Sequence, residues 1–82
     1  MRNPELSKII CNRIKQLQNK NSLTIEQLAY QSGISKGGLS ETLRGFKEPT
    51  NYTIVKICIA LNMTLKEFFD FQEIEKYMEN QK

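Results

Sequence analysis

Hydrophobic residues recur at the spacing of an α-helix along most of this chain, and no stretch alternates as a strand does. The first helix is predicted from residue 4, because Asn3 can cap it and Pro4 fits its first turn. The polar run at 19–22 is expected to end this helix. Its buried stripe is predicted to comprise Leu6, Ile9, Ile10, Ile14 and Leu17.

Two shorter helices are predicted between Thr24 and Gly45. Thr24 and Gln27 have the spacing of a capping box, and Gly33 can adopt the positive φ that turns a chain after a helix. Ser35 is a favourable N-cap for the next helix, which Gly45 ends. The apolar or small residues at helical spacing here are Ile25, Leu28, Ala29, Ile34, Leu39 and Leu43. These offsets predict a helix-turn-helix.

Two further helices are predicted before residue 70. The loop at 46–49 includes Pro49, which a helix cannot extend backward across. Thr50 can cap a helix that runs to about Asn62, and Thr64 with Glu67 has the spacing of another capping box. The apolar residues of these two helices are Ile54, Ile57, Cys58, Leu61, Leu65, Phe68 and Phe69. Residues 1–70 are therefore expected to form one compact, all-α domain of five helices.

The segment at 71–82 is predicted to be a short C-terminal helical extension that is mostly charged. Its thin apolar stripe consists of Phe71, Ile74, Tyr77 and Met78. Two interpretations fit this pattern equally. The segment is either a polar terminal helix packed loosely on the domain, or a pairing surface between two copies of the chain.

The length of 82 residues fits a single domain with a modest core. No apolar run approaches the roughly 20 residues of a membrane span, and the N-terminus lacks the apolar core of a signal peptide. Cys11 and Cys58 do not form a CxxC pair or a disulfide framework, so a reducing cytoplasm is expected. Cys58 lies on an apolar stripe and Cys11 borders one, although a redox switch is the alternative use of either thiol.

The net charge of +3 is unevenly distributed along the chain. Residues 1–66 hold ten Lys and Arg against four acids, whereas residues 67–82 hold two Lys against five acids. A basic body suits a polyanionic partner, although simple solubility accounts for a charge of this size equally well. The chain has no histidine, and it shows no nucleophile motif, paired-carboxylate pocket or metal cluster. An enzyme, a metal or another cofactor is therefore not expected.

The sequence resembles the phage-repressor (Xre/Cro-like) helix-turn-helix family over about residues 8–69. The matching residues are Ile14, Leu17, Leu23, Leu28, Ala29, Gly33, Ile34, Ser35, Leu39, Ser40, Gly45, Pro49, Thr50, Ile57, Ala60, Leu61 and Leu65. The resemblance implies a five-helix, lambda-repressor-like DNA-binding domain. Such domains usually act as dimers on a two-fold-related operator and place the helix after the turn in the major groove.

The resemblance also implies which residues contact DNA. The base-facing residues would be Ser35, Lys36, Gly37 and Glu41. The other DNA-binding residues would be Ser40, Arg44 on a phosphate, and Lys47 in the loop beyond the helix. Lys36 can donate to guanine or to a phosphate, and Glu41 can accept from cytosine. The alternative for Lys36 and Arg44 is solvated surface charge, which at the end of a helix also suits the helix dipole.

The chain departs from the family pattern at two places on the expected DNA surface. Many members have Gln at the start of the second helix, where this chain has Ile25, so that backbone contact is missing or is made by main-chain N–H groups. Gly37 and Gly38 are consecutive in the first turn of the expected recognition helix, where each glycine is unfavourable. Either the main chain approaches the DNA closely there, or DNA shape contributes more to recognition.

A third departure concerns a charged pair that is frequent in the family. Gln18 and Leu43 stand where an Arg and a Glu usually meet. Loss of both partners leaves no stranded buried charge, so it does not argue against the fold. Thr42 stands where an apolar residue is usual, and its hydroxyl can bond back to a helix carbonyl.

The resemblance implies a DNA-binding transcriptional regulator: a small repressor of prophage, plasmid or mobile-element type that binds double-stranded DNA as a homodimer. The alternative is an antitoxin or other protein-binding module that uses the same fold. It would hold a protein partner through apolar residues near the C-terminus, which are Phe68, Phe69, Phe71, Ile74 and Met78.

Overall fold

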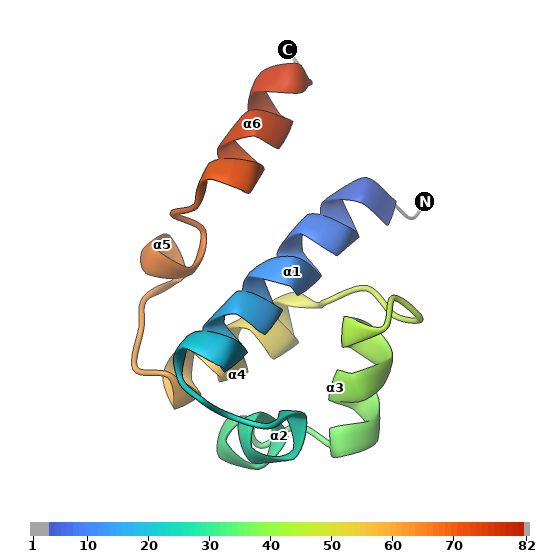
Figure 1. Ribbon diagram of the computed structural model, residues 1–82, viewed down its shortest axis with the longest axis vertical. Helices are drawn as coiled ribbons and strands as arrows, with labels where there is room; N and C mark the ends of the chain where they lie inside the picture. The colour runs from blue at the N-terminus through green and yellow to red at the C-terminus, as the bar shows by residue number, and fades with distance from the viewer. Residues whose placement is uncertain (1–3, 82) are drawn as a thin grey trace.

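The computed structural model describes residues 4–81, and within them the chain forms six α-helices and no strand (Figure 1). The helices are α1 (Pro4–Lys20), α2 (Ile25–Ser32), α3 (Lys36–Leu43), α4 (Asn51–Ala60), α5 (Leu65–Phe68) and α6 (Gln72–Asn80). The predicted all-α domain of five helices with a C-terminal helical extension is confirmed. The predicted cap of the first helix, Asn3, lies outside the described residues.

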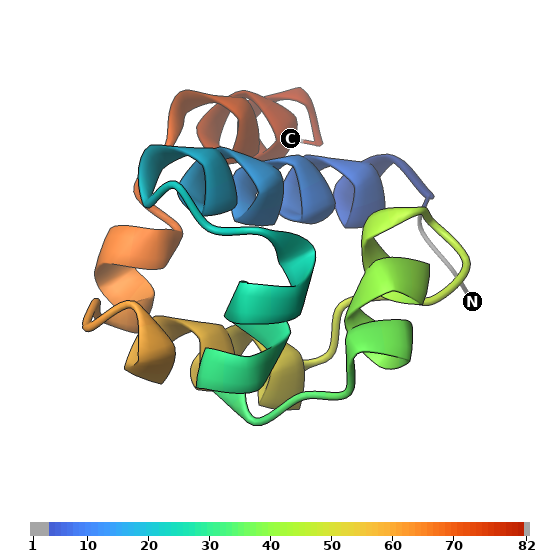
Figure 2. The same cartoon turned by 60° about the horizontal axis from the view of Figure 1, so that its bottom comes forward.

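Helix α1 is the central element of the molecule. It packs against α3 on one side and against α6 on another, while α2 packs against both α3 and α4. In Figure 2, α6 lies along α1, and α2, α3 and α4 gather on the opposite side of α1. None of the helices in the described part of the chain is long and apolar enough to cross a membrane.

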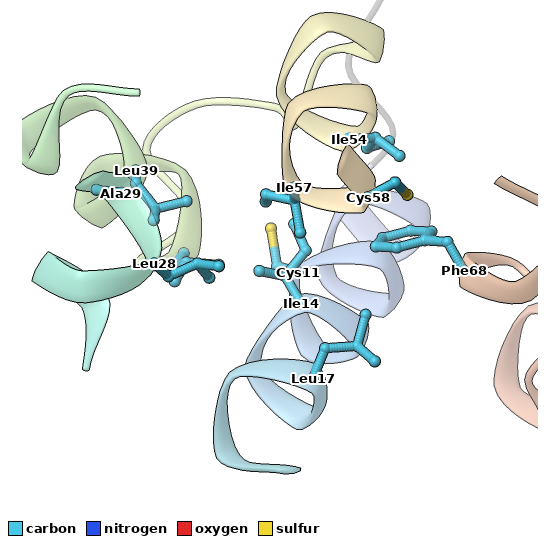
Figure 3. Close-up of a cluster of buried hydrophobic side chains, with 11 residues drawn as sticks. Cys11, Ile14, Leu17, Leu28, Ala29, Leu39, Ile54, Ile57, Cys58 and Phe68 are labelled. Atoms are coloured by element: carbon cyan, nitrogen blue, oxygen red, sulfur yellow. The ribbon is translucent and has the colours of Figure 1, made fainter. Parts of the chain in front are cut away.

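The core lies where α1, α2, α3 and α4 meet, and α5 closes it (Figure 3). Its fully buried side chains are Ile14, Leu28, Leu39, Ile57 and Phe68. Full burial of one such side chain stabilises the fold by about 1.5–3 kcal/mol. These five side chains come from five different helices, so the core joins α1, α2, α3, α4 and α5.

Both cysteines are buried in this core. Cys11 was expected only to border it, but it is 5% exposed and its thiol donates to the carbonyl oxygen of Thr42 at 3.2 Å. This bond links α1 to α3. Burial raises the pKa of both thiols, which disfavours the reactive thiolate. The environment of Cys11 and Cys58 is thus that of packing residues.

Capping boxes start two of the helices, as predicted. The Thr24 hydroxyl accepts from the main-chain N–H of Gln27, whose side chain accepts from the N–H of Thr24 in return. Thr64 and Glu67 form the same pair at the start of α5. The hydrogen bonds from Thr64 hold the pKa of the Glu67 carboxyl below its ordinary value. Thr50 likewise caps α4 by accepting from a main-chain N–H.

Four helices end in the same way, with one residue in the left-handed conformation. Gly33 and Gly45 have φ of 68° and 90°, while Ser22 and Asn62 hold φ of 56° and 55° without being glycine. After each, a main-chain N–H returns to a carbonyl five residues back, as in a Schellman motif. Because this motif ends α1 at Lys20 and α4 at Ala60, both helix ends differ by two residues from those expected.

The C-terminal segment is joined to the domain through Arg13. The Arg13 side chain donates to the carbonyl oxygens of Phe68 at 2.7 Å and Glu67 at 2.8 Å, the last turn of α5. Its guanidinium carbon also lies 5.0 Å from the centre of the Phe71 ring. One half-buried arginine thus connects α1, α5 and the start of the tail.

Helix α6 buries part of its apolar stripe. Ile74 is 7% exposed, Phe71 and Tyr77 are half-buried, and Met78 is 56% exposed. Phe68 and Ile74, which the antitoxin-like alternative placed against a protein partner, are therefore in the interior. That alternative was wrong for these two side chains. Sequence alone could not place them because α1, which covers them, is far away along the chain.

Candidate nucleic-acid interface

The helix-turn-helix forms as predicted from α2, a tight turn and α3. Gly33 takes the left-handed conformation that ends α2, and the N–H of Ile34 donates to the carbonyl of Ala29 at 3.0 Å. Ser35 then caps α3, because its hydroxyl accepts from the N–H of Gly38 at 3.0 Å. Local bonds therefore fix the angle at which α3 leaves α2.

Helix α3 has one buried face and one open face. Leu39, Thr42 and Leu43 are buried, and the Thr42 hydroxyl bonds back to the carbonyl of Gly38 at 3.0 Å, as expected. The sequence-predicted contact residues lie on the open side or beyond the helix end. Ser35, Lys36, Gly37, Glu41, Arg44 and Lys47 are exposed, and Ser40 is half-buried.

Two ion pairs cross this open surface. Lys36 Nζ lies 3.1 Å from a carboxylate oxygen of Glu26 on α2, and Lys47 Nζ lies 3.3 Å from one of Glu41. All four side chains are about half exposed or more, and such pairs contribute at most about 1 kcal/mol. Lys36, Glu41 and Lys47 can therefore exchange these partners for a ligand at little cost.

Arg44 occupies the C-cap of α3, one residue beyond the last helical turn. Its guanidinium carbon lies 4.9 Å from the centre of the Phe46 ring, and the Phe46 side chain is 61% exposed. An arginine laid across an aromatic face is held in place while its N–H donors stay in solvent. Sequence reasoning missed Phe46, whose only signal was an aromatic residue in a polar loop.

The departures from the family pattern have clear structural counterparts. Ile25 packs against the core at the start of α2, so its side chain offers no polar contact. Gln18 and Leu43 line one shallow hollow together with Ile25. Leu43 is 4% exposed, so an apolar side chain fills the place of the charged one.

The two glycines of α3 stand in different surroundings. A Cβ added to Gly37 would meet no atom within 4 Å, whereas one added to Gly38 would lie 2.8 Å from the capping oxygen of Ser35. Close packing therefore accounts for glycine at 38 but not at 37. The main chain of α3 at Gly37 is therefore open to the approach of a ligand.

Replacing Gly37 with alanine should raise the free energy of unfolding by about 0.5–1 kcal/mol, because alanine favours the helix and meets no obstacle. Urea denaturation would measure the change. Gly38→Ala is the matched control, and it should gain less or lose stability because its Cβ disturbs the Ser35 cap. A destabilised Gly37→Ala would show that this position needs glycine for the fold itself.

Within residues 4–81, no group of three or more His, Cys, Asp or Glu side chains is placed to hold a metal ion. The charged groups on the open side of α3 are instead suited to hydrogen bonds and to ionic contacts with phosphates and base edges.

Residues 13–73 match the model of the Cro/C1-type helix-turn-helix DNA-binding domain. Among solved structures, the chain is similar to an HTH_3 family transcriptional regulator from Vibrio cholerae, with a TM-score of 0.72 and 29% sequence identity. The similarity covers 82% of this chain and 38% of that one, so the chain spans well under half of the regulator's length. No curated protein matches the chain significantly.

Proposed function

Because the chain belongs to the Cro/C1-type helix-turn-helix DNA-binding domain family, a family of DNA-binding regulators, we propose that it represses transcription by occupying an operator in the cytoplasm. The supporting observation is the open face of α3. Lys36 and Gly37 are adjacent and exposed in its first turn, Glu41 is exposed one turn further on, and Arg44 follows at the helix end.

We assign sequence readout to the open face of α3, whose residues are Ser35, Lys36, Gly37, Ser40 and Glu41. Lys36 suits guanine, and Glu41 suits cytosine once Lys47 moves to a phosphate. Arg44 is assigned to a phosphate, because Phe46 orients its side chain toward solvent. Absence of a side chain at Gly37 allows close approach of the main chain to the DNA.

Binding is assigned to residues 1–70, and residues 71–82 are assigned to a C-terminal tail whose helix α6 packs against α1 and buries Ile74. The proposed active form is a homodimer, which would place two recognition helices one DNA turn, about 34 Å, apart. Its interface is assigned to α4, where Val55 and Ile59 lie four residues apart on one face and are 38% and 71% exposed.

The occupant of this α4 face is proposed to be a second copy of the chain. Between residues 51 and 60 the only charged residue is Lys56, so two such faces can meet across a two-fold axis without strong repulsion. Leu65, at the start of α5, which packs against α4, is 48% exposed. The tail is the weaker candidate because Ile74 is already used in packing.

Selection of bound DNA from a random pool tests the proposed function. The expected result is enrichment of a site with two related half-sites, with binding that weakens steeply as salt concentration rises. The folded chain at low salt should recover this site repeatedly. Recovery of no enriched sequence would contradict the proposal and favour the protein-binding module instead.

A further inference from the structure

A basic groove lies between α1, over residues 4–15, and the end of α3. It has a volume of about 310 Å³, and the charged residues among its described lining are all basic: Lys8, Lys15, Arg44 and Lys47. Its floor includes Cys11 and Leu43, which are 5% and 4% exposed. The groove therefore joins an apolar floor to walls that carry four positive charges, of which the charge of Lys47 is paired with Glu41.

Lys8 and Lys15 stand on one face of α1. They are seven residues apart, which is two helical turns or about 10 Å. Burial raises the pKa of the Cys11 thiol, and the positive charge of Lys15 opposes that rise. The Lys15 ammonium is therefore close enough to the Cys11 thiol, in the groove floor, to affect it electrostatically. The Ser7 hydroxyl and the Asn12 amide add hydrogen-bond donors to the same lining.

The groove is continuous with the proposed DNA surface through Arg44 and Lys47. A strand of DNA carries one phosphate per nucleotide, so two lysines about 10 Å apart on one face of a helix can each contact a different phosphate of the same strand. A strand that leaves Arg44 along α1 would therefore meet Lys15 and Lys8 at a suitable spacing. A free small anion would use only part of such a pair.

We propose that this groove receives the phosphodiester backbone of the DNA strand that flanks the C-terminal end of α3, with Lys8 and Lys15 as phosphate contacts. The inference rests on the proposed function and adds α1 to the DNA-binding surface. These contacts carry no sequence information, so they strengthen binding to every sequence equally.

The double variant Lys8→Gln/Lys15→Gln tests this inference. Each lost phosphate contact flattens the slope of log affinity against log salt by about 0.9, so the slope should fall by about 1.8. If affinities converge at 1 M salt, binding at 0.1 M should weaken roughly 60-fold. The ratio of operator to random-sequence affinity should stay unchanged, and so should the melting temperature.

The matched control is Lys20→Gln/Lys66→Gln, which removes the same charge from exposed positions that do not line the groove. Its slope should stay within about 0.5 of the wild-type value.

An unchanged slope in the groove variant, or an equal drop in the control, would overturn the inference while wild-type DNA binding still supports the proposed function. Tight binding of inorganic phosphate with an unaltered DNA slope would assign the groove to a small anion. A wild-type chain that binds no DNA would overturn both proposals.

Discussion

Replacing Arg13 with alanine should lower the free energy of unfolding by about 3 kcal/mol. Hydrogen bonds from a charged donor contribute about 1.5–3 kcal/mol each, and Arg13 makes two of them to carbonyls of α5. The change also removes the contact with the Phe71 ring. Urea denaturation, followed by circular dichroism at 222 nm, would measure this loss.

Two further variants test whether the loss of stability comes from the hydrogen bonds of Arg13. Arg13→Lys keeps the charge but cannot reproduce the planar fork of N–H donors, so its stability should fall between those of wild type and Arg13→Ala. Arg44→Ala removes an exposed arginine and should change stability by less than about 0.5 kcal/mol. A loss of similarly small size for Arg13→Ala would show that the connection between α1 and α5 is marginal.

Changing Ile59 to glutamate should convert the proposed dimer to a monomer at micromolar concentration. The Ile59 side chain is 71% exposed, so the fold of one copy should be unaffected, but two buried carboxylates would face each other across the interface. Because the two half-sites would then be bound independently, operator affinity should fall at least 100-fold. Sedimentation and DNA titration would measure the two effects.

Met78→Glu is the matched control for this change. It adds the same charge to an exposed apolar residue, 56% exposed, on α6. It should leave the chain dimeric and should lower operator affinity only slightly. Loss of the dimer in Met78→Glu but not in Ile59→Glu would show that the dimer interface is in the tail at 71–82. The apolar stripe of the tail would then be a pairing surface between two copies of the chain.

Local signals in the sequence predicted the helix-turn-helix well. The Thr24 cap, the left-handed Gly33 and the Ser35 cap each depend on residues within five positions, so their patterns are readable without a structure. The polar run at 19–22 predicted the end of α1, but it did not predict the left-handed conformation of Ser22, because serine seldom takes a positive φ.

Contacts between distant parts of the chain could not be predicted in this way. Arg13 was counted as part of the basic body, but its partners lie 54 and 55 residues away. The Lys36–Glu26 pair links two helices across a turn, and only the folded angle between them brings these side chains together. The basic groove likewise depends on α1 and α3 meeting, although the spacing of Lys8 and Lys15 was a usable signal.

The bonds of Arg13 to α5 also bear on the order of events during protein synthesis. Helix α1 leaves the ribosome before α5, and the carbonyl oxygens that it binds belong to residues made more than 50 positions later. The helix-turn-helix emerges in between, and for that interval α1 lacks the partners that cover its far side. A nascent chain that stops before Glu67 would thus contain the whole helix-turn-helix but lack the carbonyl oxygens that Arg13 binds, and it would be exposed to proteases and to chaperones.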